Sequence, residues 1–241
     1  MDKKVYQGAL VRISGNWAHF KKPETNNNPL THDFITKTAF IGLIGAVLGI
    51  ERSDMKRRFP ELSENLLYGV QVQTAVKKES WAFTLRKAVN ISEKAPKQME
   101  FLKNPDFLVA VALANNQSKE IYDAFIEAVE NSEAKFTPVL GLHNCPANLE
   151  LTAKGEFEQK SGEFVTKAFI TKKCIVDMKK MMGENKQMRL GFEKIPTYQN
   201  DDFWNLPEKY VEVLYPSEQN EVPVKESLHY EFTDGSKWIL I

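Results

Sequence analysis

The order of the apolar segments along the chain constrains its fold more than any other feature. Across the first 144 residues, β-branched and apolar runs alternate with segments of helical spacing in the order β-α-β-β-α-β. The sequence predicts strands and helices in the following ranges: strands at 5–13, 66–76, 106–114 and 136–142, and helices at 38–50 and 117–131. This order is typical of a ferredoxin-like α+β fold, so we expect one such domain over residues 1–144.

A basic insertion, residues 77–104, separates the second and third expected strands. Its stretch 81–89 is typical of one arm of a β-hairpin. Cationic and aromatic side chains gather in it: Lys77, Lys78, Trp81, Arg86, Lys87, Lys94 and Lys97. Within residues 77–97, only Glu79 and Glu93 oppose them. Such a patch is typical of a surface that binds the phosphates of single-stranded RNA, and an exposed hairpin without a ligand has the same pattern.

Residues 145–241 form a second, β-rich part, and no linker marks its start. We expect a hairpin over 157–170 that turns at 160–162. A second hairpin is expected over 229–241, where Asp234-Gly235 is a strong turn signal. These strands extend the predicted α+β architecture at its carboxyl end.

Three glycines lie at helical spacing in the first expected helix: Gly42, Gly45 and Gly49. Glycine inside a helix costs up to about 1 kcal/mol relative to alanine, so we expect the helix to approach a sheet closely there. The segment lacks the G-x-G-x-x-G pattern and the Gly-Lys-Ser/Thr of a P-loop, which argues against a nucleotide site.

Composition and charge narrow the class of protein. The longest apolar run, 39–50, is too short to span a bilayer, and no signal peptide is evident, so we expect a cytoplasmic protein with no membrane contact. The net charge is zero, yet residues 1–100 carry 16 basic and 10 acidic side chains, a net of +6, against 16 and 22, a net of −6, in the rest. This asymmetry indicates an anionic partner for the first part, or simply two solvated surfaces.

The loop after the first strand is the first candidate site. Residues 15–22 combine rings and cations, namely Trp17, His19, Phe20, Lys21 and Lys22. Single-stranded RNA is bound by this mixture, because bases stack on rings and cations meet phosphates. The alternative is that Trp17 and Phe20 hold the loop against the core.

The start of the first helix is the second candidate. Thr36, Lys37 and Thr38 would surround free backbone N–H groups and could bind an anion. Ordinary helix capping by the threonines is the alternative.

Metal and catalytic chemistry have weaker support. His143 and Cys145 have no second ligand pair at a helpful spacing, and Cys145 and Cys174 make no disulfide framework, so we expect no cofactor. No G-x-S-x-G nucleophile motif occurs. Of the four histidines, only His19 lies among basic residues, where it could serve acid–base cleavage of RNA.

Four segments together resemble the CRISPR-associated Cas-five family of the RAMP superfamily, most closely its subtype I-B. They are 12–15 (RISG), 17–21 (WAHFK), 38–49 (TAFIGLIGAVLG) and 138–147 (PVLGLHNCPA). The resemblance covers about the first 150 residues, and the last third of the chain carries nothing that matches.

The resemblance implies a noncatalytic subunit of a type I surveillance complex (Cascade), with an RRM-like ferredoxin fold and a β-hairpin thumb in the place of residues 77–104. Such subunits hold the 5′ handle of the guide RNA (crRNA). They contact the backbone and large subunits, and meet target DNA through the complex. The resemblance adds Arg12 to the candidate RNA-binding residues. It also favours RNA binding over the alternative explanations given for the loop, the helix start and the thumb.

Two alternatives stay open. One branch of the family cleaves precursor RNA with Tyr, Lys and His side chains, and this chain contains no Lys-His pair, so we expect processing by a separate endonuclease. An endoribonuclease that uses His19 is the first alternative, and an assembly scaffold without direct RNA contact is the second.

Overall fold

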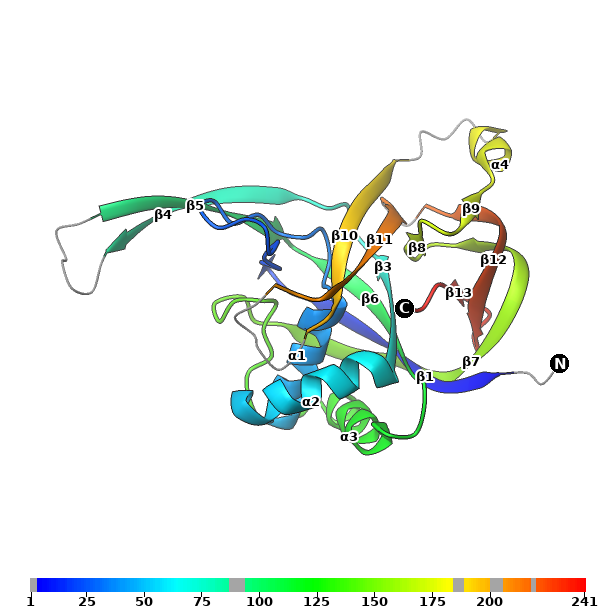
Figure 1. The fold of residues 1–241 in the computed structure, drawn as a ribbon, viewed down its shortest axis with the longest axis horizontal. Helices are drawn as coiled ribbons and strands as arrows, with labels where there is room; N and C mark the ends of the chain where they lie inside the picture. Colours follow the sequence, from blue (N-terminus) through cyan, green and yellow to red (C-terminus); the bar gives the residue numbers. More distant parts are fainter. Residues whose placement is uncertain (1–3, 87–93, 184–188, 200–205, 218–219) are drawn as a thin grey trace.

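The computed structural model describes residues 4–86, 94–183, 189–199, 206–217 and 220–241 (Figure 1). Its main sheet is antiparallel and strongly curled. The strands follow the order β13-β12-β7-β1-β6-β3, and β9 also pairs with β12. Their bounds are β1 Val5–Ser14, β3 Leu66–Val72, β6 Asp106–Leu113, β7 Asn148–Thr166, β9 Ile175–Val176, β12 Val222–Phe232 and β13 Lys237–Trp238.

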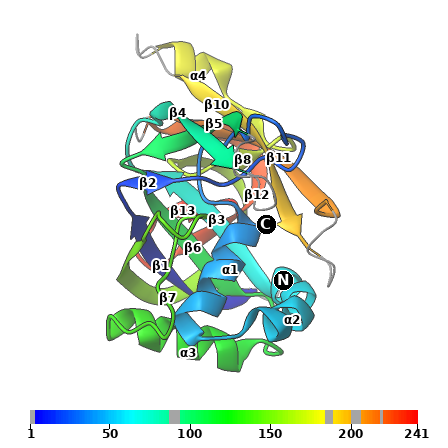
Figure 2. The same ribbon diagram turned by 90° about the vertical axis from the view of Figure 1, so that its left-hand side faces the viewer.

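Three helices lie together over one face of this sheet, as Figure 2 shows: α1 Lys37–Leu48, α2 Arg52–Asn65 and α3 Lys119–Glu130. Side chains alternate between the two faces of a strand, so Ala9, Val11 and Ile13 of β1 enter the core beneath the helices. Leu10 points the other way, into a second core that β12 and β13 close with Phe232 and Trp238. Both faces of β1 are therefore buried in the middle of the strand, over residues 8–11.

A long hairpin projects from the body at the left of Figure 1. It consists of β4 Lys78–Arg86 and β5 Lys94–Lys103, and the short strand β2 Trp17–Ala18 pairs with its base. We call residues 77–104 the thumb. The hairpin predicted for the basic insertion is confirmed.

A small sheet with the order β10-β11-β8 lies beside the start of α1. Its strands are β10 Leu190–Tyr198, β11 Lys209–Pro216 and β8 Ile170–Thr171, and the short helix α4 spans Met178–Gly183. The sheet brings carboxyl-end residues next to the loop that precedes α1.

The mixed α/β class is confirmed, and the β-α-β-β-α-β order appears as β1, α1, β3, β6, α3 and β7. Two strand predictions are wrong. Residues 136–142 form a loop with one isolated bridge, and the fourth strand is β7. The expected hairpin over 157–170 is absent, because residues 160–162 continue β7 and pair with β12 at a β-bulge. Gly162, with φ of 125°, serves this irregularity and not a turn.

The carboxyl-end hairpin at Asp234-Gly235 is confirmed, since β12 pairs with β13 across that turn. The predicted domain boundary near residue 145 falls just before β7, and the main sheet continues across it. Among the described residues, no helix has the length and apolarity needed to cross a membrane.

The glycines of α1 do not bring it close to a sheet, which corrects that expectation. Gly45 lies against Met55 of α2, Gly49 ends the helix with φ of 67°, and Gly42 faces open space. Helix α1 therefore lies close to α2 at Gly45 and faces open space at Gly42.

Candidate nucleic-acid interface

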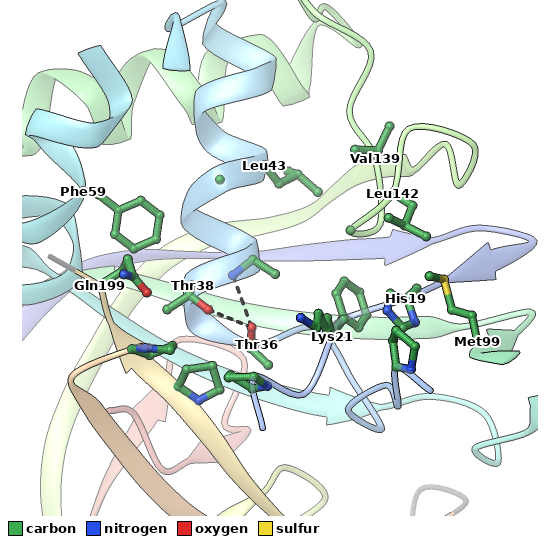
Figure 3. A pocket seen from close by; sticks show the side chains of 18 residues that line it. His19, Lys21, Thr36, Thr38, Leu43, Phe59, Met99, Val139, Leu142 and Gln199 are labelled. Atoms are coloured by element: carbon green, nitrogen blue, oxygen red, sulfur yellow. Dashed lines mark hydrogen bonds between the residues drawn. The ribbon is translucent and has the colours of Figure 1, made fainter. Parts of the chain in front are cut away.

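A pocket of about 580 Å³ lies at the amino end of α1 (Figure 3). We call it the α1 pocket. It brings together segments that are distant in sequence: the loop after β2, the first turns of α1, the thumb strand β5 and the loop at 139–142. Its lining includes the predicted residues His19, Phe20, Lys21, Thr36 and Thr38, together with Met99 and Gln199. Two segments that the sequence singled out separately thus form one site.

Main-chain hydrogen bonds fix the loop that enters the pocket. The His19 amide donates to the Leu140 carbonyl at 3.0 Å, and the His32 amide donates to the Phe20 carbonyl at 2.8 Å. A side chain at Gly141, where φ is 90°, would collide with the His19 carbonyl. The 138–147 segment therefore needs glycine at 141 to hold this loop.

His19 is buried, with 3% of its surface exposed. Its Nδ1 lies 2.6 Å from the Glu100 carbonyl oxygen, which accepts, so Nδ1 carries a proton. Burial lowers the pKa of His19 more than this carbonyl raises it. The ring is therefore neutral at pH 7.

The rings of the loop pack inward. Phe20 is buried against Phe107, with ring centroids 6.2 Å apart. The half-buried Trp17 meets Trp81 edge-on, at 4.5 Å. The alternative for this loop was that its rings pack against the core. Phe20 does so fully, and Trp17 does so in part.

The start of α1 is capped by its own side chains. The Thr36 hydroxyl accepts from the Ala39 amide at 3.2 Å and lies 3.1 Å from the Thr38 hydroxyl. Lys37 does not join the pocket, which corrects its assignment to an anion site. Its Nζ is buried and donates to the main-chain oxygen of Ile241 at 3.0 Å, and burial lowers its pKa to about 8.

Ion pairs hold the base of the thumb to the body, and two of the predicted RNA-binding cations, Lys78 and Lys22, belong to this group of ion pairs. Lys78 Nζ lies 2.6 Å from Asp33 and 3.2 Å from Glu100. Lys22 Nζ lies 3.0 Å from the buried Glu193. We call this group the ion network; its members are Lys22, His32, Asp33, Lys78, Glu100, Glu193 and Tyr215.

The network shifts the pKa values of Asp33 and Lys78, among others. Burial alone raises the pKa of Asp33, but hydrogen bonds from Lys78 and Tyr215 outweigh it and hold that pKa below its usual value. Burial lowers the pKa of Lys78, and Asp33 and Glu100 more than compensate. Lys78 is thus a permanently charged, internally paired side chain and not a free phosphate ligand.

Other candidate cations have different surroundings. Lys21 and Lys77 are exposed, and Lys21 donates to Asn26 at 3.3 Å. Arg12 is half exposed and binds Asp106 through two hydrogen bonds of 3.0 and 2.7 Å, away from the pocket. Lys87 lies outside the described residues, as does the side chain of Arg86, whose main chain ends β4.

A strip of rings connects the thumb with the α1 pocket. Phe83 and Trp81 lie 6.1 and 5.1 Å from Phe101, measured between ring centroids, and Phe101 lies 5.6 Å from His19. Trp81 and Phe83 are half-buried, so part of each ring faces solvent. We call these four residues the ring strip. The sequence indicated Trp81 and His19, and the period-2 pattern of β4 and β5 could have indicated the other two.

The remaining pocket walls are residues that sequence reasoning missed. They are apolar side chains from four segments: Leu43, Phe59, Met99, Val139 and Leu142. Leu43 belongs to the 38–49 segment, and Val139 and Leu142 belong to the 138–147 segment; the sequence indicates both segments only as parts of a resemblance. No group of three or more potential metal ligands occurs among the described residues.

Comparison with known proteins gives the family. The profile of CRISPR-associated protein (Cas_Cas5) matches residues 9–205, which is well over half of the chain. The chain belongs to the Cas5 family. No curated protein sequence gives a significant match to this Cas5 protein.

Solved structures agree on the fold of this Cas5 protein. A CRISPR protein from Archaeoglobus fulgidus superposes with a TM-score of 0.56 at 13% identity, covering 98% of each chain. A chain of a CRISPR RNA-guided surveillance complex superposes with a TM-score of 0.54 at 13% identity, covering 90% of this chain and 91% of the other. The mixed α/β fold expected from the sequence is confirmed.

Proposed function

We propose that this Cas5 protein is a noncatalytic subunit of a type I surveillance complex (Cascade) that binds and caps the 5′ handle of the crRNA. The observation that carries the proposal is the ring strip, which runs from the thumb into the α1 pocket. Half-buried rings flanked by cations suit unstacked bases and their phosphates.

The charges near the strip fit an RNA strand. Lys77, Lys94 and Lys21 are exposed, and the described residues give the first two no side-chain partner. They carry the phosphate contacts in this proposal. Lys22, Lys78 and Arg12 contribute less, because each is already paired with a carboxylate.

Membership of the Cas5 family supports the proposed protein and DNA partners. We infer that the chain contacts the backbone and large subunits of a Cascade complex and acts on target DNA only through that complex. One neighbour in fold is itself a chain of an RNA-guided surveillance complex. Subtype I-B is the assignment that the sequence resemblance favours.

The absence of catalysis is part of the proposal. His19 is the histidine considered for acid–base cleavage, and its Nδ1 is already used by the Glu100 carbonyl. Incubating the purified protein with repeat RNA in chelator tests this. Cleavage that disappears in His19→Ala would replace the capping function with the endoribonuclease alternative.

Binding of a 3′-labelled handle RNA at stepped salt concentrations tests the capping function. Lys77→Ala and Lys94→Ala are each expected to weaken binding and to lower the log–log salt slope by about 0.7. Lys225→Ala is the matched control, because Lys225 is an exposed lysine on β12, on the opposite side of the molecule from the thumb.

Two results would count against the capping function. The first is no RNA binding at low salt, either by the protein alone or in the assembled complex. The second is complex assembly that is unchanged without guide RNA together with unchanged slopes in both thumb variants, which would favour the scaffold alternative.

A further inference from the structure

We propose that the α1 pocket holds one unstacked nucleobase, and that His19 Nε2 accepts a hydrogen bond from that base. This inference rests on the proposed RNA binding and adds a base-binding site to it. The site is formed by residues from α1, the loop after β2, the thumb and the loop at 139–142.

The size and the lining of the pocket fit a planar, mostly apolar ligand. Its volume of about 580 Å³ lies within the range of small-molecule sites. Figure 3 shows His19 and Met99 at one end and Phe59 and Gln199 at the other, with Thr38 and Lys21 between them. Apolar walls with a few polar groups would hold a base by its faces and orient it by its edge.

His19 supplies an acceptor of fixed position. The Glu100 carbonyl fixes the proton on Nδ1, so the neutral ring has a lone pair on Nε2. The described residues offer Nε2 no hydrogen-bond partner, although the side chain is 3% exposed and lines the pocket. Nε2 is open to the pocket, where a ligand that donates can reach it.

Nucleobases meet this requirement and phosphates do not. Each of the four RNA bases has an N–H group on its Watson–Crick edge, whereas an ionised phosphate ester only accepts. The exposed Lys21, also in the pocket lining, is the group suited to the phosphate of the same nucleotide. The base therefore lies at the His19 end, with its backbone toward Lys21.

Gly42 keeps the pocket open. A Cβ atom built on Gly42 meets nothing within 4 Å, whereas one on Gly45 would meet Met55. Glycine disfavours a helix relative to alanine, and at Gly42 no packing contact requires it. Gly42 is itself part of the pocket lining, so a side chain here would reduce the space available to a ligand.

The experiment measures binding of 3′-labelled handle RNAs in which one nucleotide at a time is abasic. In the wild type, one abasic position is expected to reduce affinity about tenfold. In Gly42→Leu, intact RNA is expected to bind about tenfold more weakly, the penalty at that position disappears, and the salt slope is unchanged. Gly42→Ala is the matched control and should stay within about threefold of wild type.

A base analogue tests His19 without changing the protein. At the sensitive position, an analogue that lacks the donating N–H group should bind wild-type protein several-fold more weakly than the natural base. In His19→Phe the two RNAs should bind equally.

Three outcomes would overturn the inference while leaving the proposed function intact: RNA binding with no sensitive abasic position, wild-type affinity in Gly42→Leu, or an analogue that binds wild-type protein as well as the natural base. Loss of all RNA binding by the wild-type protein, alone and in the complex, would overturn both.

Discussion

Replacing Lys78 by methionine should destabilise the fold rather than remove an RNA contact. The change deletes an ion pair of 2.6 Å to Asp33, one of 3.2 Å to Glu100 and a hydrogen bond of 3.1 Å to the Thr31 carbonyl. It also leaves two carboxylates near each other, 17% and 20% exposed, without their shared cation.

The magnitude follows from the burial of the three groups. Breaking a fully buried pair costs about 3–5 kcal/mol, and hydrogen bonds to charged groups contribute about 1.5–3 kcal/mol each. Lys78 keeps 29% of its side-chain surface exposed, so we expect the lower end. The free energy of unfolding should fall by about 2–3 kcal/mol.

Urea denaturation of both proteins measures this change, and Lys77→Met is the matched control. Lys77 is the adjacent lysine, is exposed and has no side-chain partner among the described residues, so its loss should change stability by less than about 0.5 kcal/mol. Adding Asp33→Asn to Lys78→Met should recover part of the loss, because it removes an unpaired carboxylate.

RNA binding should show the opposite order. Lys77→Met should lower the salt slope and Lys78→Met should leave it unchanged, because only a free lysine releases counterions from a phosphate. Equal stability of the two variants, or a lower slope in Lys78→Met alone, would refute the assignment of Lys78 to the ion network.

Three further predictions concern α1 and the thumb. Burial lowers the folded-state pKa of Lys37 to about 8, below its unfolded value, so the stability of the wild type should rise relative to Lys37→Met by about 2–3 kcal/mol as pH increases from 8 to 10.5. Chemical denaturation of both proteins across that range measures this change, and parallel curves of stability against pH would contradict it. Gly42→Ala should raise the free energy of unfolding by up to about 1 kcal/mol, and Gly45→Ala should gain less because a methionine must move; equal gains in thermal unfolding would contradict the packing. A double-mutant cycle of Trp17→Ala and Trp81→Ala should give a coupling of about 1 kcal/mol in urea denaturation, and purely additive losses would show that the edge-on contact adds no stability of its own.

Features encoded by local pattern could be predicted from the sequence. The thumb hairpin, β1, β6 and α3 follow from alternating or helical spacing within a dozen residues. Helix α2 was missed, although Met55, Phe59 and Leu62 have helical spacing, because its other residues are mostly polar. The turn expected at 160–162 failed because pairing with the distant β12 decides that segment.

The candidate site was only partly predictable, for the same reason. Residue types identified the loop after β1 and the start of α1, and the fold joined them in one pocket. Which cations are free depends on partners far along the chain: Lys37 finds Ile241, 204 residues away, and Lys22 finds Glu193. No local pattern carries that information.

The position of β1 has a consequence for synthesis on the ribosome. Its two neighbours, β6 and β7, begin about one hundred and about one hundred and forty residues later. A nascent chain therefore carries an apolar strand with an unpaired edge until residue 158 has emerged, which favours late folding and dependence on chaperones.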